Sequence, residues 1–155
     1  MPVGPGDPWA SYTRTVVEIV GSGVDGLVVR SAPPGHVGEW PWPSPRAVHI
    51  LTAWDPGFDR PGDQTNRLRQ AALEAHLRPL VAALWPAVGV DPVSGHREEG
   101  VAVRGIREPD ALALGARYGQ DAIFAWTPEE WTVVACTGGR RVVSGWSVTK
   151  PGSGQ

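Results

Sequence analysis

Apolar and polar positions near the start of the chain follow the pattern of a β-hairpin. Val16 to Val20 form a mostly apolar run, glycines at 21 and 23 interrupt it, and Leu27 to Arg30 form a second run. Short runs rich in β-branched residues on either side of a Gly-Ser-Gly segment are typical of two antiparallel strands joined by a turn. We therefore predict a hairpin over residues 16–30.

A proline-rich stretch and a continuous apolar run follow the hairpin. Prolines recur through residues 32–45, and because proline lacks a backbone donor and has a fixed φ, this stretch is predicted to be a long loop. Residues 47–54 are apolar at almost every position and end at Asp55-Pro56. A short run of this kind is typical of a strand that is buried on both faces.

Two later segments have helical spacing. Gln70, Leu73 and Leu77 recur at three- and four-residue steps within residues 64–78, which predicts a helix that ends before Pro79. A second helix is predicted from Glu108-Pro109-Asp110, with proline in the first turn, to a left-handed cap at Gly119.

The remaining apolar runs complete a predicted fold. Strands are expected at 84–88, 100–106, 122–126, 131–136 and 141–146, with residues 89–99 as a loop and the proline-containing strand 84–88 at an edge. From residue 47 to 126 the order is strand, helix, strand, strand, helix, strand, which is the ferredoxin-like order. We therefore expect an α+β fold: a single, mostly antiparallel sheet with two helices on one face, a ferredoxin-like βαββαβ core and extra N- and C-terminal strands.

Length and composition indicate one domain. A chain of 155 residues with 41% hydrophobic residues and eight tryptophans can bury a single core. We predict one α+β domain over residues 9–149. Residues 1–8 and 150–155 are rich in proline and glycine, so we expect a flexible N-terminus and a flexible C-terminal tail.

Charge and cysteine content exclude several classes of partner. The net charge of −2 offers no basic field for nucleic acid, and no run approaches the ~20 apolar residues that a membrane span needs. The single cysteine, Cys136, cannot form an internal disulfide, and the first residues lack the pattern of a secretory signal, so we expect a cytoplasmic protein. We predict neither a cofactor nor a metal, because no metal-ligand spacing is present.

Four short signatures resemble a known family. They are Leu51-Thr52-Ala53-Trp54-Asp55-Pro56, an asparagine at 66, Val88-Gly89-Val90-Asp91-Pro92 and Arg117-Tyr118-Gly119-Gln120-Asp121-Ala122-Ile123. In this order and spacing they resemble the bacterial domain-of-unknown-function family 3293, over about residues 12 to 126. The resemblance implies no activity.

The chain departs from the family pattern at three places. The family usually has asparagine at the positions of Asp55 and Asp121, and a tryptophan before an acidic residue near His96-Arg97-Glu98. Aspartate keeps the acceptor oxygens of asparagine but loses its amide donors and adds a charge. A ligand contact that family members make through those side chains would therefore differ here.

Five residues are candidates for binding a small polar ligand. Trp54, Asp55, Asn66 and Arg69 lie around the end of a buried strand and the start of a helix, and Gln120 precedes another strand that could lie nearby. An aromatic ring, a carboxylate, two amides and a guanidinium could hold such a molecule together. Alternatively, Asp55-Pro56 forms a turn, Trp54 belongs to the core, and Asn66 and Gln120 hydrogen-bond the backbone.

His96 and Glu98 are the candidate catalytic residues. A histidine oriented by a carboxylate can act as a general base, although a loop of mixed charge is often only solvated. His36 and Glu39 could join them around a metal ion, but a proline-rich loop promises no defined ligand geometry. Cys136 could be a nucleophile, yet its apolar neighbours favour a buried small residue.

The tryptophans leave two further alternatives open. Trp40 and Trp42 could form a lid over a partner or ligand, or pack against the sheet. Our leading hypothesis is a non-catalytic module that binds a small polar molecule or a protein partner. The alternatives are a small enzyme that uses His96 and Glu98 for proton transfer, with Asn66, Arg69 and Gln120 positioning the substrate, and a homo-oligomeric structural protein.

Overall fold

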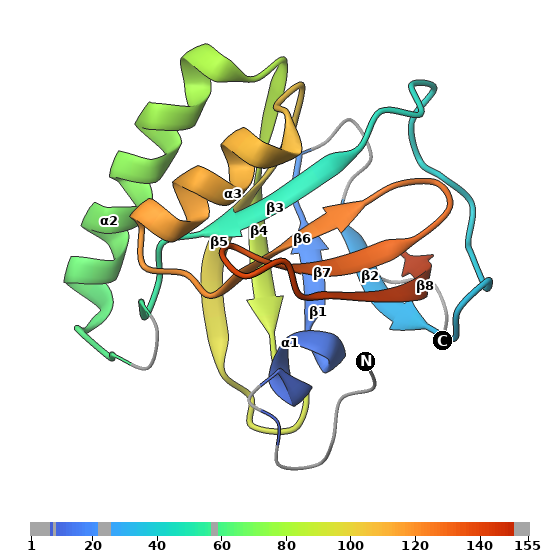
Figure 1. Cartoon of the computed structure of the whole chain (residues 1–155), viewed down its shortest axis with the longest axis horizontal. Coiled ribbons are helices and arrows are strands. Elements are labelled where there is room, and N and C mark those ends of the chain that lie inside the picture. The colour runs from blue at the N-terminus through green and yellow to red at the C-terminus, as the bar shows by residue number, and fades with distance from the viewer. Residues whose placement is uncertain (1–6, 8, 22–25, 57–58, 151–155) are drawn as a thin grey trace.

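The strands of the chain form a closed antiparallel barrel. The computed structural model describes residues 7, 9–21, 26–56 and 59–150, and Figure 1 shows the strands curving around a common interior. The neighbours around the barrel are β1-β2-β8-β7-β6-β3-β5-β4, and β4 pairs with β1. The strands are β1 Val16–Ile19, β2 Leu27–Ala32, β3 Val48–Thr52, β4 Ala83–Val90, β5 Arg97–Arg104, β6 Ala122–Trp126, β7 Trp131–Ala135 and β8 Arg141–Thr149.

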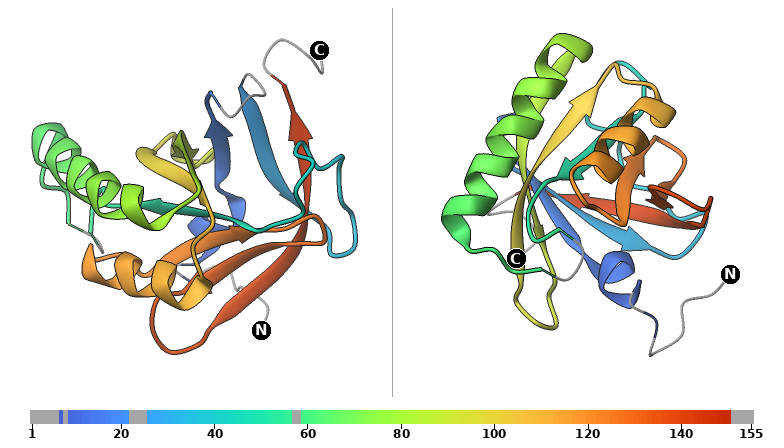
Figure 2. Two further views of the ribbon diagram at one scale, coloured as in Figure 1. Left: turned by 90° about the horizontal axis from the view of Figure 1, so that it is seen from above. Right: turned by 60° about the vertical axis from the view of Figure 1, so that its left-hand side comes forward.

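Two long helices cover part of the outer wall, as Figure 2 shows from two directions. They are α2 (Asp63–Leu77), followed by a 3-10 turn at Arg78–Leu80, and α3 (Glu108–Arg117). A short helix α1 (Ala10–Arg14) precedes β1. The apolar faces of α2 and α3 bury a second core against the outside of the barrel, which contains Leu51, Leu73, Leu77, Val101, Val103, Ala111, Leu114 and Ile123. Among the described residues, no helix has the length and apolar character needed to cross a membrane.

Indole rings fill one end of the barrel interior. Trp126, Trp131 and Trp146 are almost completely buried there. The loop between β2 and β3 adds Trp40 and Trp42, whose ring centroids lie 4.8 and 5.4 Å from that of Trp126. The indoles meet edge to face, the arrangement that the charge distribution of aromatic rings favours. Trp40 and Trp42 therefore pack into the barrel, which was one of the two alternatives for them.

The predicted open, ferredoxin-like sheet is wrong. The segments between residues 48 and 126 supply four adjacent strands, β6-β3-β5-β4, but this sheet does not end at β4. The hairpin of β1 and β2 joins β4 to β8 and closes the barrel. Hydrophobic periodicity identifies strands but carries no information on which distant strand pairs with an exposed edge, so the sequence did not reveal closure.

The predicted edge position of strand 84–88 is also wrong, because β4 pairs on both sides. Pro86 is tolerated at the last rung beside β1. Its carbonyl accepts the N–H of Val20 at 2.9 Å, just beyond the end of β1, so only one terminal ladder bond is lost with its missing donor.

Two further expectations need comment. Residues 97–99 were predicted to lie in a loop but belong to β5, so the loop between β4 and β5 shortens to residues 91–96. The predicted flexible ends fall largely on residues 1–6, 8 and 151–155, which lie outside the described residues. Asp7, which is described, forms an ion pair with Arg140.

Closure makes possible a cross-link that an open sheet with β4 at its edge would forbid. Glu18 and Val88 are paired across β1 and β4, and paired residues of antiparallel strands have Cα atoms about 4.5–5.5 Å apart, within disulfide range. In a Cys136→Ala background, Glu18→Cys with Val88→Cys should form an intramolecular disulfide on mild oxidation. The measurement is thiol titration and mass spectrometry of the linked peptides.

A matched control uses Val88→Cys with Glu99→Cys, which are paired across β4 and β5. These two strands are neighbours in the barrel and in the open sheet alike. A disulfide in the control combined with free thiols in the Glu18 and Val88 variant would contradict closure.

Candidate functional site

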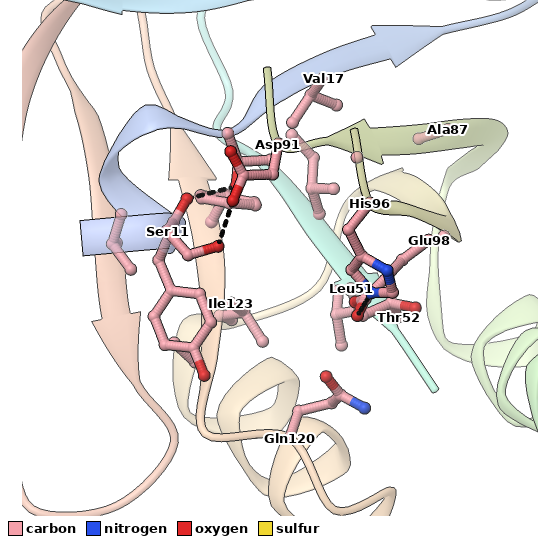
Figure 3. A pocket seen from close by; sticks show the side chains of 18 residues that line it. Ser11, Val17, Leu51, Thr52, Ala87, Asp91, His96, Glu98, Gln120 and Ile123 are labelled. Carbon is pink, nitrogen blue, oxygen red and sulfur yellow. Dashed lines mark hydrogen bonds and ion pairs between the residues drawn. The ribbon is translucent and has the colours of Figure 1, made fainter. Parts of the chain in front are cut away.

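A cavity of about 110 Å³ lies in the barrel, and Figure 3 shows the side chains that line it. They include Thr52, at the end of β3 opposite Val48, which pairs with Trp126, so the cavity lies at the end away from the indole rings. Small inward-facing side chains leave this space: Ala87 and Gly89 on β4, Gly100 on β5 and Ala122 on β6. A side chain at Gly100 would bring its Cβ to 2.7 Å from the carbonyl oxygen of Leu51, so glycine is required for this close approach. The apolar wall includes Val17, Ile50, Ile123, Phe124 and Val133.

The mouth of the cavity is polar. His96, Glu98 and Gln120 line it together with Tyr12 and Asp91. The cavity thus combines an apolar floor with a small number of polar groups, the usual composition of a small-molecule site.

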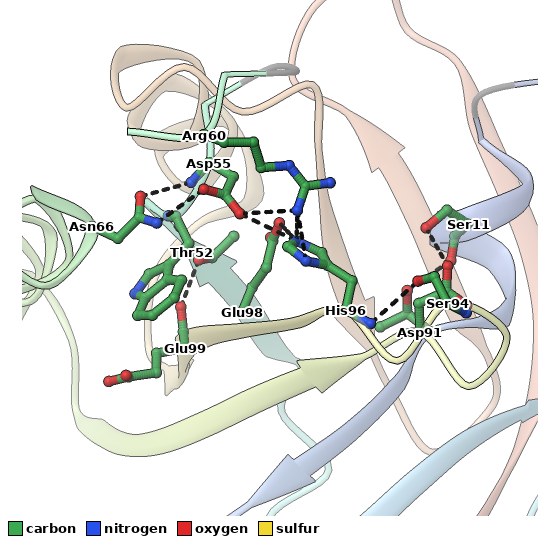
Figure 4. Close-up of polar contacts among 12 residues, drawn as sticks. Ser11, Thr52, Asp55, Arg60, Asn66, Asp91, Ser94, His96, Glu98 and Glu99 are labelled. Carbon is green, nitrogen blue, oxygen red and sulfur yellow. Dashed lines mark hydrogen bonds and ion pairs between the residues drawn. The ribbon is translucent and has the colours of Figure 1, made fainter. Parts of the chain in front are cut away.

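His96 lies between two carboxylates (Figure 4). Its Nε2 is 2.9 Å from Oε2 of Glu98 and 3.2 Å from Oδ2 of Asp55. Arg60 donates from Nη1 to Nδ1 of His96 at 2.8 Å. Because a guanidinium can only donate, we assign Nδ1 as the acceptor and place the ring hydrogen on Nε2, facing the carboxylates.

Asp55 is held by a reciprocal pair of hydrogen bonds with Asn66 of α2. The N–H of Asp55 donates to Oδ1 of Asn66 and Nδ2 of Asn66 donates to Oδ1 of Asp55, both at 2.9 Å. Asp55 adopts a φ of 43°, in the left-handed region, and is 9% exposed. A non-glycine residue in this region is uncommon and costs on the order of 1 kcal/mol or more, so the surrounding bonds must maintain it. They leave Oδ2 directed at His96.

Asp91 holds the loop that carries His96. Its carboxylate accepts the N–H groups of Val93 at 2.9 Å and Ser94 at 3.4 Å, and both guanidinium bonds of Arg14 at 2.8 Å. Its own N–H donates to the carbonyl of His96. The bonds from Arg14, followed by the backbone bonds, hold the pKa of Asp91 far below its usual range. Asp91 is therefore an anchor that α1 and β4 share.

The pKa of Glu98 is shifted in the opposite direction to that of Asp91. Burial raises the pKa of its carboxyl above the usual value, and the neighbouring charge of Asp55 adds to this, while His96 and Arg60 oppose it. The net direction means that ionised Glu98 is less stable here than in water. Strained or destabilised groups of this kind cluster at functional sites.

Comparison with known proteins identifies this part of the chain. Residues 51–123 match the sequence model of a family described as a protein of unknown function, DUF3293. Residues 51–123, which we call the DUF3293 segment, are therefore similar to this family. The resemblance inferred from the four signatures is confirmed, and the DUF3293 segment contains Asp55, His96 and Glu98. No curated protein and no solved structure matches the chain.

The structure separates the predicted site residues into two groups. Within the DUF3293 segment, His96, Glu98 and Gln120 line the cavity, and Asp55 contacts His96. The assignment of these residues to catalysis or ligand binding stays a prediction.

The other three predicted residues hold the 53–56 loop. Arg69 donates to the carbonyls of Ala53 and Tyr118, and Trp54 is 8% exposed with its carbonyl accepting Nε2 of Gln120 at 3.0 Å. The side-chain amide of Asn66 forms both of its hydrogen bonds described above with Asp55. These side chains position the site and do not line the cavity.

Several contributing residues were not predicted. Tyr12, which donates to Asp121 at 3.1 Å, and Arg14 come from outside the DUF3293 segment, and no local signal in the sequence relates them to it. Asp91 could have been found, because it lies within the Val88–Pro92 signature. Arg60 carries no signal beyond its charge.

The remaining candidates lie elsewhere. Burial raises the pKa of the Cys136 thiol to about 11, so this cysteine is not activated. Among the described residues, the cluster of possible metal ligands consists of Asp55, His96 and Glu98, and it does not include His36 or Glu39.

The depressed pKa of Asp91 predicts a pH-dependent effect of Asp91→Asn. Its contribution to stability is present above its unfolded pKa of about 4 and is lost as the pH falls toward its lower folded pKa. Asp91→Asn should lower the free energy of unfolding by about 2 kcal/mol at pH 7, and the difference should shrink below about pH 4. Urea unfolding followed by tryptophan fluorescence measures both values.

Asp63→Asn is the matched control, because Asp63 is largely exposed and forms only a 4.0 Å surface pair with Arg67. Its effect should stay within about 0.5 kcal/mol at every pH. If Asp91→Asn lowered the free energy of unfolding by the same amount at every pH, the stabilising role of Asp91 would not depend on its charge, and the prediction would be wrong.

The raised pKa of Glu98 predicts that Glu98→Gln stabilises the fold at neutral pH. The cost of the ionised group is fully present above its folded pKa and disappears as the pH falls below its unfolded value of about 4.3. The variant should therefore have a higher free energy of unfolding than wild type at pH 7, with a gap that closes toward pH 4. A lower stability of Glu98→Gln at pH 7 would mean that the bond to His96 outweighs burial.

Proposed function

We propose that the barrel binds a small molecule, with an apolar group in the cavity and a polar group against His96, Glu98 and Gln120. The observation that carries the proposal is the unfilled apolar space beside polar side chains at the mouth of a barrel whose other end is packed with indole rings. Concave sites with few, converging polar groups are where proteins bind small ligands.

The volume limits the size of the ligand. A dry cavity of roughly 150 Å³ accommodates benzene, whereas a drug-sized molecule requires roughly 300 Å³ or more. With about 110 Å³, the cavity suits one short branched chain or a small ring, and the rest of the ligand would lie in the mouth. The cavity therefore limits the size of the group that enters it.

A second candidate, acid–base catalysis, is favoured by the position of His96. Its Nε2 faces Glu98 and Asp55, and its side chain is 29% exposed beside the cavity. An oriented imidazole next to a binding space is the arrangement that proton transfer requires. Binding of a protein partner loses its main support, because Trp40, Trp42 and Trp146 pack into the barrel.

Filling the cavity should abolish binding. Ala122→Leu adds volume inside the mouth, and Ala72→Leu adds the same volume on the exposed face of α2. Hits from a screen of small fragments, found by thermal shift and ligand-detected NMR, should bind Ala122→Leu at least about tenfold more weakly, a loss of about 1.4 kcal/mol. Ala72→Leu should bind them as wild type does.

If both variants bound all hits as tightly as wild type, the cavity would not be the binding site.

The same hits can be used to distinguish binding from catalysis. A product formed by wild type but not by His96→Ala, which still binds the compound, would establish the enzymatic alternative. Unchanged compounds after long incubation with wild type would support a binding role.

A further inference from the structure

The three side chains around Nε2 of His96 come from separate parts of the DUF3293 segment. Asp55 follows β3, His96 ends the loop after β4, and Glu98 points inward from β5. Asn66 holds Asp55 by a hydrogen bond, and Asp91 holds the loop that carries His96. Glu98 is held by its place in β5. The three donor atoms all lie within 4.8 Å of one another.

The cluster has one hydrogen for two carboxylates. The Nε2–H of His96 can donate to Glu98 at 2.9 Å, which leaves Oδ2 of Asp55, at 3.2 Å, without a hydrogen of its own. The nearest other donor is Nη1 of Arg60 at 3.7 Å, beyond hydrogen-bond range. Among the described residues, this oxygen of the largely buried Asp55 thus has no protein donor of its own and is available to a ligand.

We infer that Asp55, His96 and Glu98 bind a divalent transition-metal ion at the mouth of the barrel. A metal would replace the single hydrogen and satisfy both carboxylates at once. Imidazole and carboxylate ligands together suit zinc, iron and related metals. This departs from the expectation of no metal, which rested on the lack of a local ligand spacing.

The geometry fits such an ion. Bonds of about 2.0–2.2 Å place tetrahedral ligands roughly 3.3–3.6 Å apart. The two separations from Nε2 are 2.9 and 3.2 Å, so the side chains need to move apart only slightly. Three protein ligands leave a fourth position open, as in catalytic zinc sites. Because His96 and Glu98 line the cavity, that position would face it.

Arg60 is the group that must move. It donates to Nδ1 of His96, and this nitrogen would carry the ring hydrogen once Nε2 coordinates a metal. The Arg60 side chain is 66% exposed, so water can take its place. Its positive charge also opposes a second cation in the cluster, so removing it should favour metal binding.

The test uses the full-length protein stripped of metal by a chelator, titrated with Zn²⁺ by calorimetry and with Co²⁺ by visible absorption. One equivalent of Zn²⁺ should bind and raise the midpoint of thermal unfolding, and Co²⁺ should give the absorption of a low-coordinate site. Asp55→Asn and Glu98→Gln should each weaken Zn²⁺ binding by at least about 100-fold. Both variants keep the size of the native side chain and one of its two acceptor oxygens, and Glu98→Gln is expected to fold well.

Two controls define the site. Glu99→Gln changes the neighbouring, outward-facing carboxylate and should leave Zn²⁺ affinity within about twofold. Arg60→Gln should bind Zn²⁺ a few-fold more tightly, the effect of one exposed charge.

The inference would be overturned by a dissociation constant for Zn²⁺ above about 1 mM in wild type. It would also be overturned if Asp55→Asn and Glu98→Gln both bound Zn²⁺ as tightly as wild type. Ala122→Leu keeps all three ligands, so it separates this inference from the proposed organic ligand. Zinc binding by Ala122→Leu with loss of the fragments would mean that the two sites stand independently.

Discussion

The pairing of β1 with β4 is the constraint on which the site depends. It closes the sheet, and closure gives the interior a limited volume that side chains must fill. Three buried tryptophans fill one end. At the other end, alanines and glycines of β4, β5 and β6 leave the cavity. An open sheet with the same sequence would expose both groups on one face, and neither the packed nor the empty end would exist.

Two residues beside His96, Asp55 and Glu98, are in states that lower the stability of the fold. Asp55 is held in a left-handed conformation, and Glu98 carries its charge in a partly buried position beside a second carboxylate. Asn66 and Asp91 compensate, because each uses several hydrogen bonds to maintain one of the two loops. Stability lost at a rigid, polar centre and restored by the groups around it is typical of sites that bind or react.

The sequence predicted local features well and distant contacts poorly. The helix predicted at 64–78 is observed at Asp63–Leu77, because its apolar spacing reflects the face that packs on the barrel. His96 and Glu98 were recognised as a pair because they are close in the chain. Neither the contact of Asp55 with His96 nor the pairing of β1 with β4 could be predicted, since both join segments whose proximity arises only when the barrel closes.

The boundary of the DUF3293 segment cuts through the site in an informative way. The titratable groups, Asp55, His96 and Glu98, lie inside residues 51–123, whereas Tyr12, Val17 and Val133 of the cavity wall lie outside. Part of the cavity wall is thus encoded outside the stretch that carries these three polar groups. Substitutions in the flanking stretches would therefore reshape that part of the wall and leave the three polar groups unchanged, so the two features can vary separately in evolution.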